Sequence, residues 1–393
     1  MAEDPRKPDQ VDEEKVAKKK DDKVGLLALG ALVLFLGGVV YWAIPKDDAK
    51  PPATSADAGA GPATSSGART TPTDDAIAPR TKNALERLGE ATCELFILTD
   101  KPEAKVQEVA NVDGIVKLLD VRYCGAACDA VKKNMADKDR FEVEVSKTDD
   151  YILPPKTSFD TVAPTLTPAE RATIDKKPVG VVIRARGPST IDQLPARTCF
   201  AATAALAETL GGFVYDETLR RIETAPQLTA HAITAPLGQS VFTPKHIVVQ
   251  LYKQEDGTAR VLTLGMVRFG SPDFTLHGSA MELGSSLASI ANTVAAYAAA
   301  ARTESPVVVT IADVARASGK KPEELAKSPA DRTPLKLVSF DHERVEGDPE
   351  NDMIELLPLG AAQEDDARRE AWLAAVQGLF GDWRVRLPDA GAR

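Results

Sequence analysis

Histidine and cysteine, the side chains that most often bind transition metals or serve as nucleophiles and bases, are scarce in this sequence. Four of each occur among 393 residues, and the histidines stand singly at 231, 246, 277 and 342. No H-E-x-x-H or H-x-H spacing is present, and the globular part of the chain has no G-x-S-x-G, P-loop or dinucleotide fingerprint. The sequence therefore predicts no catalytic residue, no metal ligand and no cofactor.

Two local groups of polar residues have simpler explanations than a metal site. Asp341, His342 and Glu343 are adjacent, and neighbouring residues of a strand point to opposite faces, so these three cannot converge on one ion. Residues 347–352, GDPEND, lack the D-x-D-x-D-G order of a calcium loop and are typical of a turn.

An excess of positive charge is also absent. The chain has 48 Lys and Arg against 58 Asp and Glu, which gives a formal net charge of −10. Binding to nucleic acid needs a basic face that can meet phosphates, so nucleic-acid partners are excluded. The acidic balance favours solubility of the folded part.

One long apolar run stands out against these absences. Residues 24–44, VGLLALGALVLFLGGVVYWAI, contain no charge over 21 residues. As a helix the run would reach about 30 Å, the thickness of the hydrocarbon core of a bilayer. Lys23 and Lys46 flank it, and Tyr41 and Trp42 lie near its end, where aromatic rings favour the membrane interface. It predicts a single transmembrane helix.

The lysines predict the orientation of this helix. Six precede the run and only Lys46 and Lys50 follow closely, so residues 1–23 are expected to form a cytoplasmic tail and the body to be periplasmic or extracellular. A cleaved signal peptide fits less well, because its apolar region is shorter and its cleavage site nearer. Small residues seven apart, such as Gly30 and Gly37, would allow a homodimer through the helix.

Residues 45–80 contain one large apolar side chain, Ile77, among many Pro, Ala, Thr and Ser. Such a segment cannot bury enough surface to offset the entropy of ordering, so it is expected to be a disordered linker. As a flexible chain it would span roughly 30–35 Å.

The composition becomes globular from about residue 81, and this length predicts two domains. The first, 81–156, is expected to be a small cysteine-containing α/β domain. The second, 157–388, is expected to be an α+β domain with a mixed or antiparallel sheet, so that the chain as a whole is α+β. The expected strands are 93–100, 141–147, 180–187, 246–252, 259–269, 306–311, 333–340 and 351–359, and the expected helices are 104–118, 124–136, 195–210, 282–300 and 363–380.

The cysteines leave several pairings open. Outside the cytoplasm an even number of cysteines fits disulfide formation, with Cys93, Cys124 and Cys128 as the candidates, and buried free thiols are the alternative. Cys124 and Cys128 have three residues between them, whereas thioredoxin-like redox pairs have two, and residues four apart in a regular helix bridge only with strain. Cys199 falls on an apolar helix face and is expected in the core.

Residues 263–273, TLGMVRFGSPD, resemble a segment of certain uncharacterised bacterial proteins. Residues 212–221, GFVYDETLRR, and 347–351, GDPEN, are similar to other parts of the same group, so the resemblance covers about 180–385 with L-G-M-x-x-F-G-x-P-D as its specific part. It implies a bacterial α+β domain without an assigned activity. From its residue types, the segment 263–273 predicts a strand that enters a tight turn. The alternative is that Arg268 and Asp273 of this segment form the rim of a pocket together with His246 and His277.

Taken together, an anchor, a linker and a folded body without a catalytic motif favour a membrane-tethered binding or scaffold protein of the bacterial envelope, with a protein partner of unknown identity. One alternative is an enzyme whose site residues meet only in the tertiary structure. Another is a thiol-redox protein that uses Cys124 and Cys128.

Overall fold

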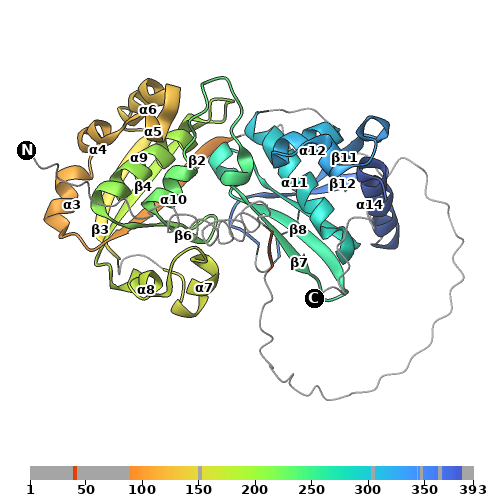
Figure 1. The fold of residues 1–393 in the computed structure, drawn as a ribbon, viewed down its shortest axis with the longest axis horizontal. Helices are drawn as coiled ribbons and strands as arrows, with labels where there is room; N and C mark the ends of the chain where they lie inside the picture. Colours follow the sequence, from red (N-terminus) through yellow and green to blue (C-terminus); the bar gives the residue numbers. More distant parts are fainter. Residues whose placement is uncertain are drawn as a thin grey trace, which may run out of the picture. The chain divides into compact units, whose positions relative to one another are not determined.

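A computed structural model describes residues 39–41, 89–148, 153–301, 306–342, 344, 345, 348–361 and 365–382. The expected tail 1–23, the linker 45–80 and all of the run 24–44 except residues 39–41 lie outside these residues. Residues 39–41 form the strand β1 (Val39–Tyr41) and not part of the helix expected over 24–44. Among the described residues, no helix is both long and apolar enough to cross a bilayer. The described residues from Val40 onward belong to one compact unit that contains two β-sheets (Figure 1).

The first sheet has five strands, and every neighbouring pair in it is antiparallel. Its central strand is β2, whose residues Leu95–Leu98 are apolar without interruption. Leu95 and Ile97 face one core and Phe96 and Leu98 face another, as expected for a strand covered on both faces. In spatial order the strands are β3 (Phe141–Lys147), β4 (Val179–Pro188), β2 (Glu90–Thr99), β5 (Phe213–Asp216) and β6 (Arg221–Thr224).

Helices cover both faces of this sheet (Figure 1). The longest, α9 (Leu194–Leu210), packs on β2 and β4. The same core receives α3 (Glu103–Val109), α4 (Val112–Leu118), α5 (Val121–Cys124), α6 (Cys128–Met135) and α10 (Ala225–Ala230). On the other face lie α7 (Phe159–Val162) and α8 (Pro168–Arg171), with Phe159, Val162 and Leu166 against the sheet.

The second sheet has seven strands and is mixed, because β9 and β12 are parallel whereas the other described pairings are antiparallel. This confirms the expected α+β class. In spatial order the strands are β1 (Val39–Tyr41), β7 (Val248–Lys253), β8 (Thr258–Leu264), β9 (Asp273–Ala280), β12 (Met353–Pro358), β11 (Leu335–Asp341) and β10 (Val307–Val309). The helices whose apolar side chains share a core with it are α11 (Gly284–Ala299), α12 (Ile311–Ser318), α13 (Pro322–Leu325) and α14 (Asp365–Phe380).

The domain boundary expected between residues 156 and 157 falls within a single sheet. It would separate β2 and β3 from β4, although β4 pairs with β2 over ten residues and with β3 over seven. The polar stretch that suggested a boundary carries apolar residues that cover the other face of the same sheet: Phe159, Val162, Leu166 and Ile174. The chain passes from one sheet to the other later, between the end of β6 at Thr224 and the start of β7 at Val248.

Two expected helices are interrupted. The helix expected over 104–118 divides at Asn111, whose side chain caps α4 by accepting a hydrogen bond from the Gly114 backbone N–H. The helix expected over 124–136 is broken at Gly125, which has φ of +55°. A β carbon on Gly125 would lie 2.2 Å from the carbonyl oxygen of Thr234, so only glycine fits this position without movement.

Candidate functional site

The segment 264–273 connects β8 to β9 where the seven-stranded sheet meets the five-stranded one. The strand expected over 259–269 ends at Leu264, because Gly265 adopts φ of +105° and Met266–Phe269 then form the 3-10 helix η8. Gly270 closes this turn with φ of +67°. Its carbonyl oxygen accepts a hydrogen bond of 2.7 Å from the Gly89 backbone N–H, just before β2.

Arg268 and Asp216 form a buried ion pair between the two sheets. One terminal nitrogen of Arg268 donates to both carboxylate oxygens of Asp216, at 2.9 and 3.0 Å. Arg268 is 1% exposed and its guanidinium lies 5.4 Å from the ring centre of Phe200 on α9. Burial by itself would lower the pKa of Arg268, but the Asp216 carboxylate raises that pKa above its ordinary value. The arginine therefore stays charged inside the protein and joins η8 to β5.

Asp273 fixes the other end of the segment. Its side chain is fully buried and accepts hydrogen bonds from the Thr263 hydroxyl at 3.0 Å, the Met266 backbone N–H at 3.2 Å and the Asn351 amide at 2.8 Å. Burial raises the pKa of Asp273 to about 6, although these donors and Arg268 oppose the shift. The carboxyl group holds the turn between β8 and β9 and the loop that precedes β12.

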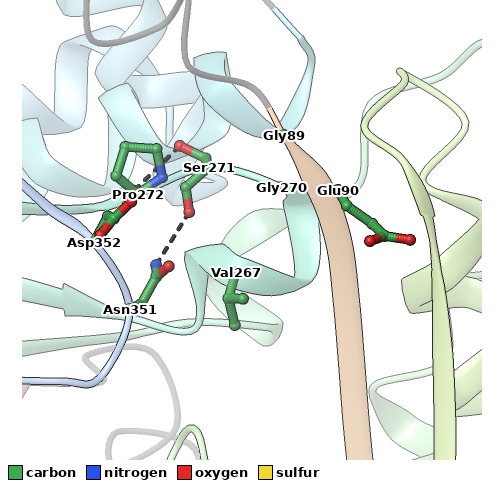
Figure 2. A pocket seen from close by; sticks show the side chains of 8 residues that line it. All are labelled: Gly89, Glu90, Val267, Gly270, Ser271, Pro272, Asn351 and Asp352. Carbon is green, nitrogen blue, oxygen red and sulfur yellow. Dashed lines mark hydrogen bonds between the residues drawn. The ribbon is translucent and has the colours of Figure 1, made fainter.

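A small pocket opens beside this turn (Figure 2). The amide of Asn351 donates to the carbonyl oxygen of Ser271 at 3.1 Å across it. Its volume is about 150 Å³, which is below the roughly 300 Å³ at which small-molecule sites usually begin. The pocket is lined by Gly89, Glu90, Val267, Gly270, Ser271, Pro272, Asn351 and Asp352.

The four residues expected at a pocket rim do not line this pocket. Arg268 and Asp273 point inward and hold the turn from behind. The pocket wall is formed by other residues of the same segment, namely Val267, Gly270, Ser271 and Pro272. His246 is 2% exposed and packs edge-on against Phe200, with ring centres 4.9 Å apart. Burial, and then the charge of Arg268, hold the pKa of His246 well below its ordinary value, so the ring is neutral. His277 lies elsewhere in the sheet.

Of the candidate disulfide cysteines, the structure joins Cys124 to Cys128 and leaves Cys93 as a buried free thiol. The bridge is compatible with a spacing of four because Gly125 breaks the helix between the two residues. Cys93 lies beside Cys199 in the core between β2 and α9. Burial raises the pKa of the Cys199 thiol, and the neighbouring Cys93 adds to this effect. A redox role for the bridged pair stays a prediction.

A second polar group lies on the seven-stranded sheet and was not foreseen from the sequence. His277, His342 and Glu355 each offer a ligand atom, and these atoms all lie within 4.8 Å of one another. The three residues come from β9, from the position after β11, and from β12. No local spacing reveals such a group, because its members are separated by 65 and 13 positions in the sequence and meet only through strand pairing.

Comparison of the chain with models of known protein families, with curated proteins and with solved structures gives no match.

The contact of Gly270 with the first sheet leads to a prediction for stability. A β carbon at Gly270 would lie 2.8 Å from the carbonyl oxygen of Gly89 and 2.8 Å from Cβ of Ser189. We expect Gly270→Ala to lower the free energy of unfolding by about 2 kcal/mol, from the positive φ and the displaced backbone together. Urea unfolding of the full-length protein measures this loss.

Gly257 provides the matched control. It has φ of +82° in the β7–β8 turn, but a β carbon there would meet nothing within 4 Å. Gly257→Ala should therefore cost only the backbone term, about 1 kcal/mol. Equal losses for the two variants would show that the close approach at Gly270 contributes nothing.

Proposed function

We propose that this chain is a binding or scaffold protein of the bacterial cell envelope, held at the membrane by residues 24–44. The observation that carries the proposal is the order of segments along the chain: an uncharged apolar run, a segment poor in large apolar residues, and then a large folded body. In this proposal residues 1–23 are cytoplasmic, and the body is periplasmic or extracellular and meets a protein partner there.

The Cys124–Cys128 disulfide supports this location. Disulfides persist in oxidising compartments and are rare in the cytosol of most organisms. Cys128 is half-buried, so the bridge lies close enough to solvent for small thiols to reduce it where the compartment is reducing.

One feature of the described residues supports binding through a surface. The buried charges of Arg268 and Asp216 pair with each other and connect the two sheets, which makes the body a firm support for a docking surface.

Limited proteolysis of cells from which the outer barrier has been removed tests the location. We expect protease added outside to cut the linker 45–80 and release a fragment containing 89–382, while residues 1–23 stay protected until the membrane is dissolved. A full-length chain that stays uncut until the membrane is opened would contradict the proposed orientation. A full-length chain with Leu32→Arg and Leu36→Arg in the apolar run is the control and should leave the membrane fraction.

In-cell cross-linking followed by mass spectrometry tests the partner. We expect a reproducible envelope protein cross-linked to the full-length chain and absent when residues 89–382 are deleted. Cross-links between copies of the chain that survive this deletion would indicate self-association through 24–44 instead. Absence of any foreign partner at near-stoichiometric yield would contradict the scaffold function.

A further inference from the structure

His277, His342 and Glu355 come together on the seven-stranded sheet. Neighbouring residues of a strand face opposite sides, so His277 lies on the face opposite Leu276 of β9, and Glu355 lies on the face opposite Ile354 and Leu356 of β12. His342 follows the last residue of β11, which pairs with β12 at Ile354. Strand pairing therefore brings the three side chains to one place.

The distances between the ligand atoms of these side chains are close to those in a metal site. Nε2 of His277 is 3.3 Å from a carboxylate oxygen of Glu355. Bonds of about 2.0–2.1 Å in a tetrahedral zinc site place ligand atoms about 3.4 Å apart. The ligand atoms of the three residues lie within 4.8 Å of one another. Side-chain rotations that move these atoms by about an ångström would bring them within bonding distance of one ion.

From this geometry we propose that His277, His342 and Glu355 bind a divalent transition-metal ion of the zinc class. Two imidazoles and one carboxylate suit Zn²⁺, Fe²⁺ and Co²⁺, and three protein ligands leave a position for water or a substrate. The side chains are 22%, 10% and 13% exposed, in the order His277, His342 and Glu355, so an ion can reach the site from solvent.

The surroundings support the ligands. Asp348, whose side chain is fully buried, contacts Nε2 of His342 at 3.2 Å and orients this ring, and Arg260 lies 3.2 Å from the same nitrogen. The indole N–H of Trp372 donates to the backbone carbonyl of His277 at 3.2 Å and fixes that part of β9 against α14. The site is thus built on paired strands rather than on a loose loop.

An ion-pair network without metal is the competing explanation. Arg260 pairs with Asp348, and Arg368 lies 3.8 Å from Glu355. Both imidazoles belong to this network, because Nε2 of His277 lies 3.3 Å from Glu355 and Nε2 of His342 lies 3.2 Å from Asp348. Zn²⁺ binding distinguishes a metal site from the network alone.

Titration of Zn²⁺ into the chelator-treated, full-length protein, purified without a histidine tag, tests the proposal. We expect one equivalent of tight binding, with His277→Gln and His342→Gln each weakening it at least about 100-fold. His231→Gln is the matched control, because His231 forms a similar pair with Glu223 at 3.3 Å beside the other sheet and belongs to no such cluster among the described residues. It should bind as the wild type does.

Chemical modification of the wild-type protein provides a second test, which does not depend on whether the variants fold. Diethyl pyrocarbonate acylates accessible imidazoles, and peptide mass spectrometry locates the products. Zn²⁺ should protect His277 and His342 and leave His231 reactive. The proposal is overturned if no equivalent of Zn²⁺ binds, if both glutamine variants bind as tightly as the wild type, or if Zn²⁺ protects neither ring.

Discussion

Arg268→Met is expected to lower the free energy of unfolding by about 3–5 kcal/mol, because it leaves the carboxylate of Asp216 buried without its countercharge. Within the described part of the chain, Asp216 then keeps the hydrogen bond from the Leu219 backbone N–H. The loss should be visible in urea or thermal unfolding of the full-length protein. The substitution should also loosen the contact between η8, which connects β8 to β9 of the seven-stranded sheet, and β5 of the five-stranded sheet.

Two further variants separate this explanation from lost packing. In the double variant Arg268→Met with Asp216→Asn neither charge of the pair remains, so much of the stability should return. Arg184→Met is the surface control: Arg184 contacts Glu94, Glu142 and Glu144 but is 35% exposed, and its loss should cost about 1 kcal/mol or less. A loss for Arg268→Met no greater than that for Arg184→Met would refute the central role of the buried pair.

The stability of the protein should fall with rising pH through the titration of Asp273. Its carboxyl group has an ordinary pKa of 3.8, and burial raises this pKa to about 6 in the folded protein. Between these values the folded chain holds a proton that the unfolded chain has released, so stabilisation is fully present below about 3.8 and is lost as the pH rises through about 6. At about 1.4 kcal/mol per pKa unit the total is about 3 kcal/mol.

The titration of His246 changes stability with pH in the opposite direction. The pH dependence of the wild type alone would therefore not isolate the contribution of Asp273. Its pKa is depressed in the folded protein, so its stabilisation is present above the ordinary value of 6.5 and is lost as the pH falls below it. Comparison with Asp273→Asn cancels this contribution, because both proteins keep His246. From about pH 7.5 to about pH 4.5, the wild type should gain about 2 kcal/mol of unfolding free energy relative to the variant.

Asp256 provides the control for this comparison. It lies in the exposed β7–β8 turn, where the Thr258 backbone N–H lowers the pKa of its carboxyl group. Asp256→Asn should therefore show a difference of the opposite sign on acidification. A difference between the wild type and Asp273→Asn that stays constant with pH would mean that Asp273 ionises in the folded protein as it does in the unfolded chain.

Local patterns in the sequence were enough to predict many individual elements, but they missed others, among them β5, β6, β9 and α12. The alternation in FEVEVSK corresponds to β3 at the expected residues, and the apolar spacing over 195–210 and 282–300 corresponds to α9 and α11 within two residues. These predictions succeed because side-chain periodicity reports directly which face of an element is buried. They fail where one glycine redirects the backbone, as at Gly125 and Gly265.

The sequence by itself determined the scarcity of chemically active residues, the apolar run that predicts an anchor, and the α+β class. Only the tertiary structure decided which strands share a sheet, because β4 pairs with strands that precede it by up to about 90 residues. The same pairing buries Arg268 and Asp273 instead of exposing them at a rim, and brings His277, His342 and Glu355 together. Contacts between distant residues depend on strand order and register, which local periodicity does not encode.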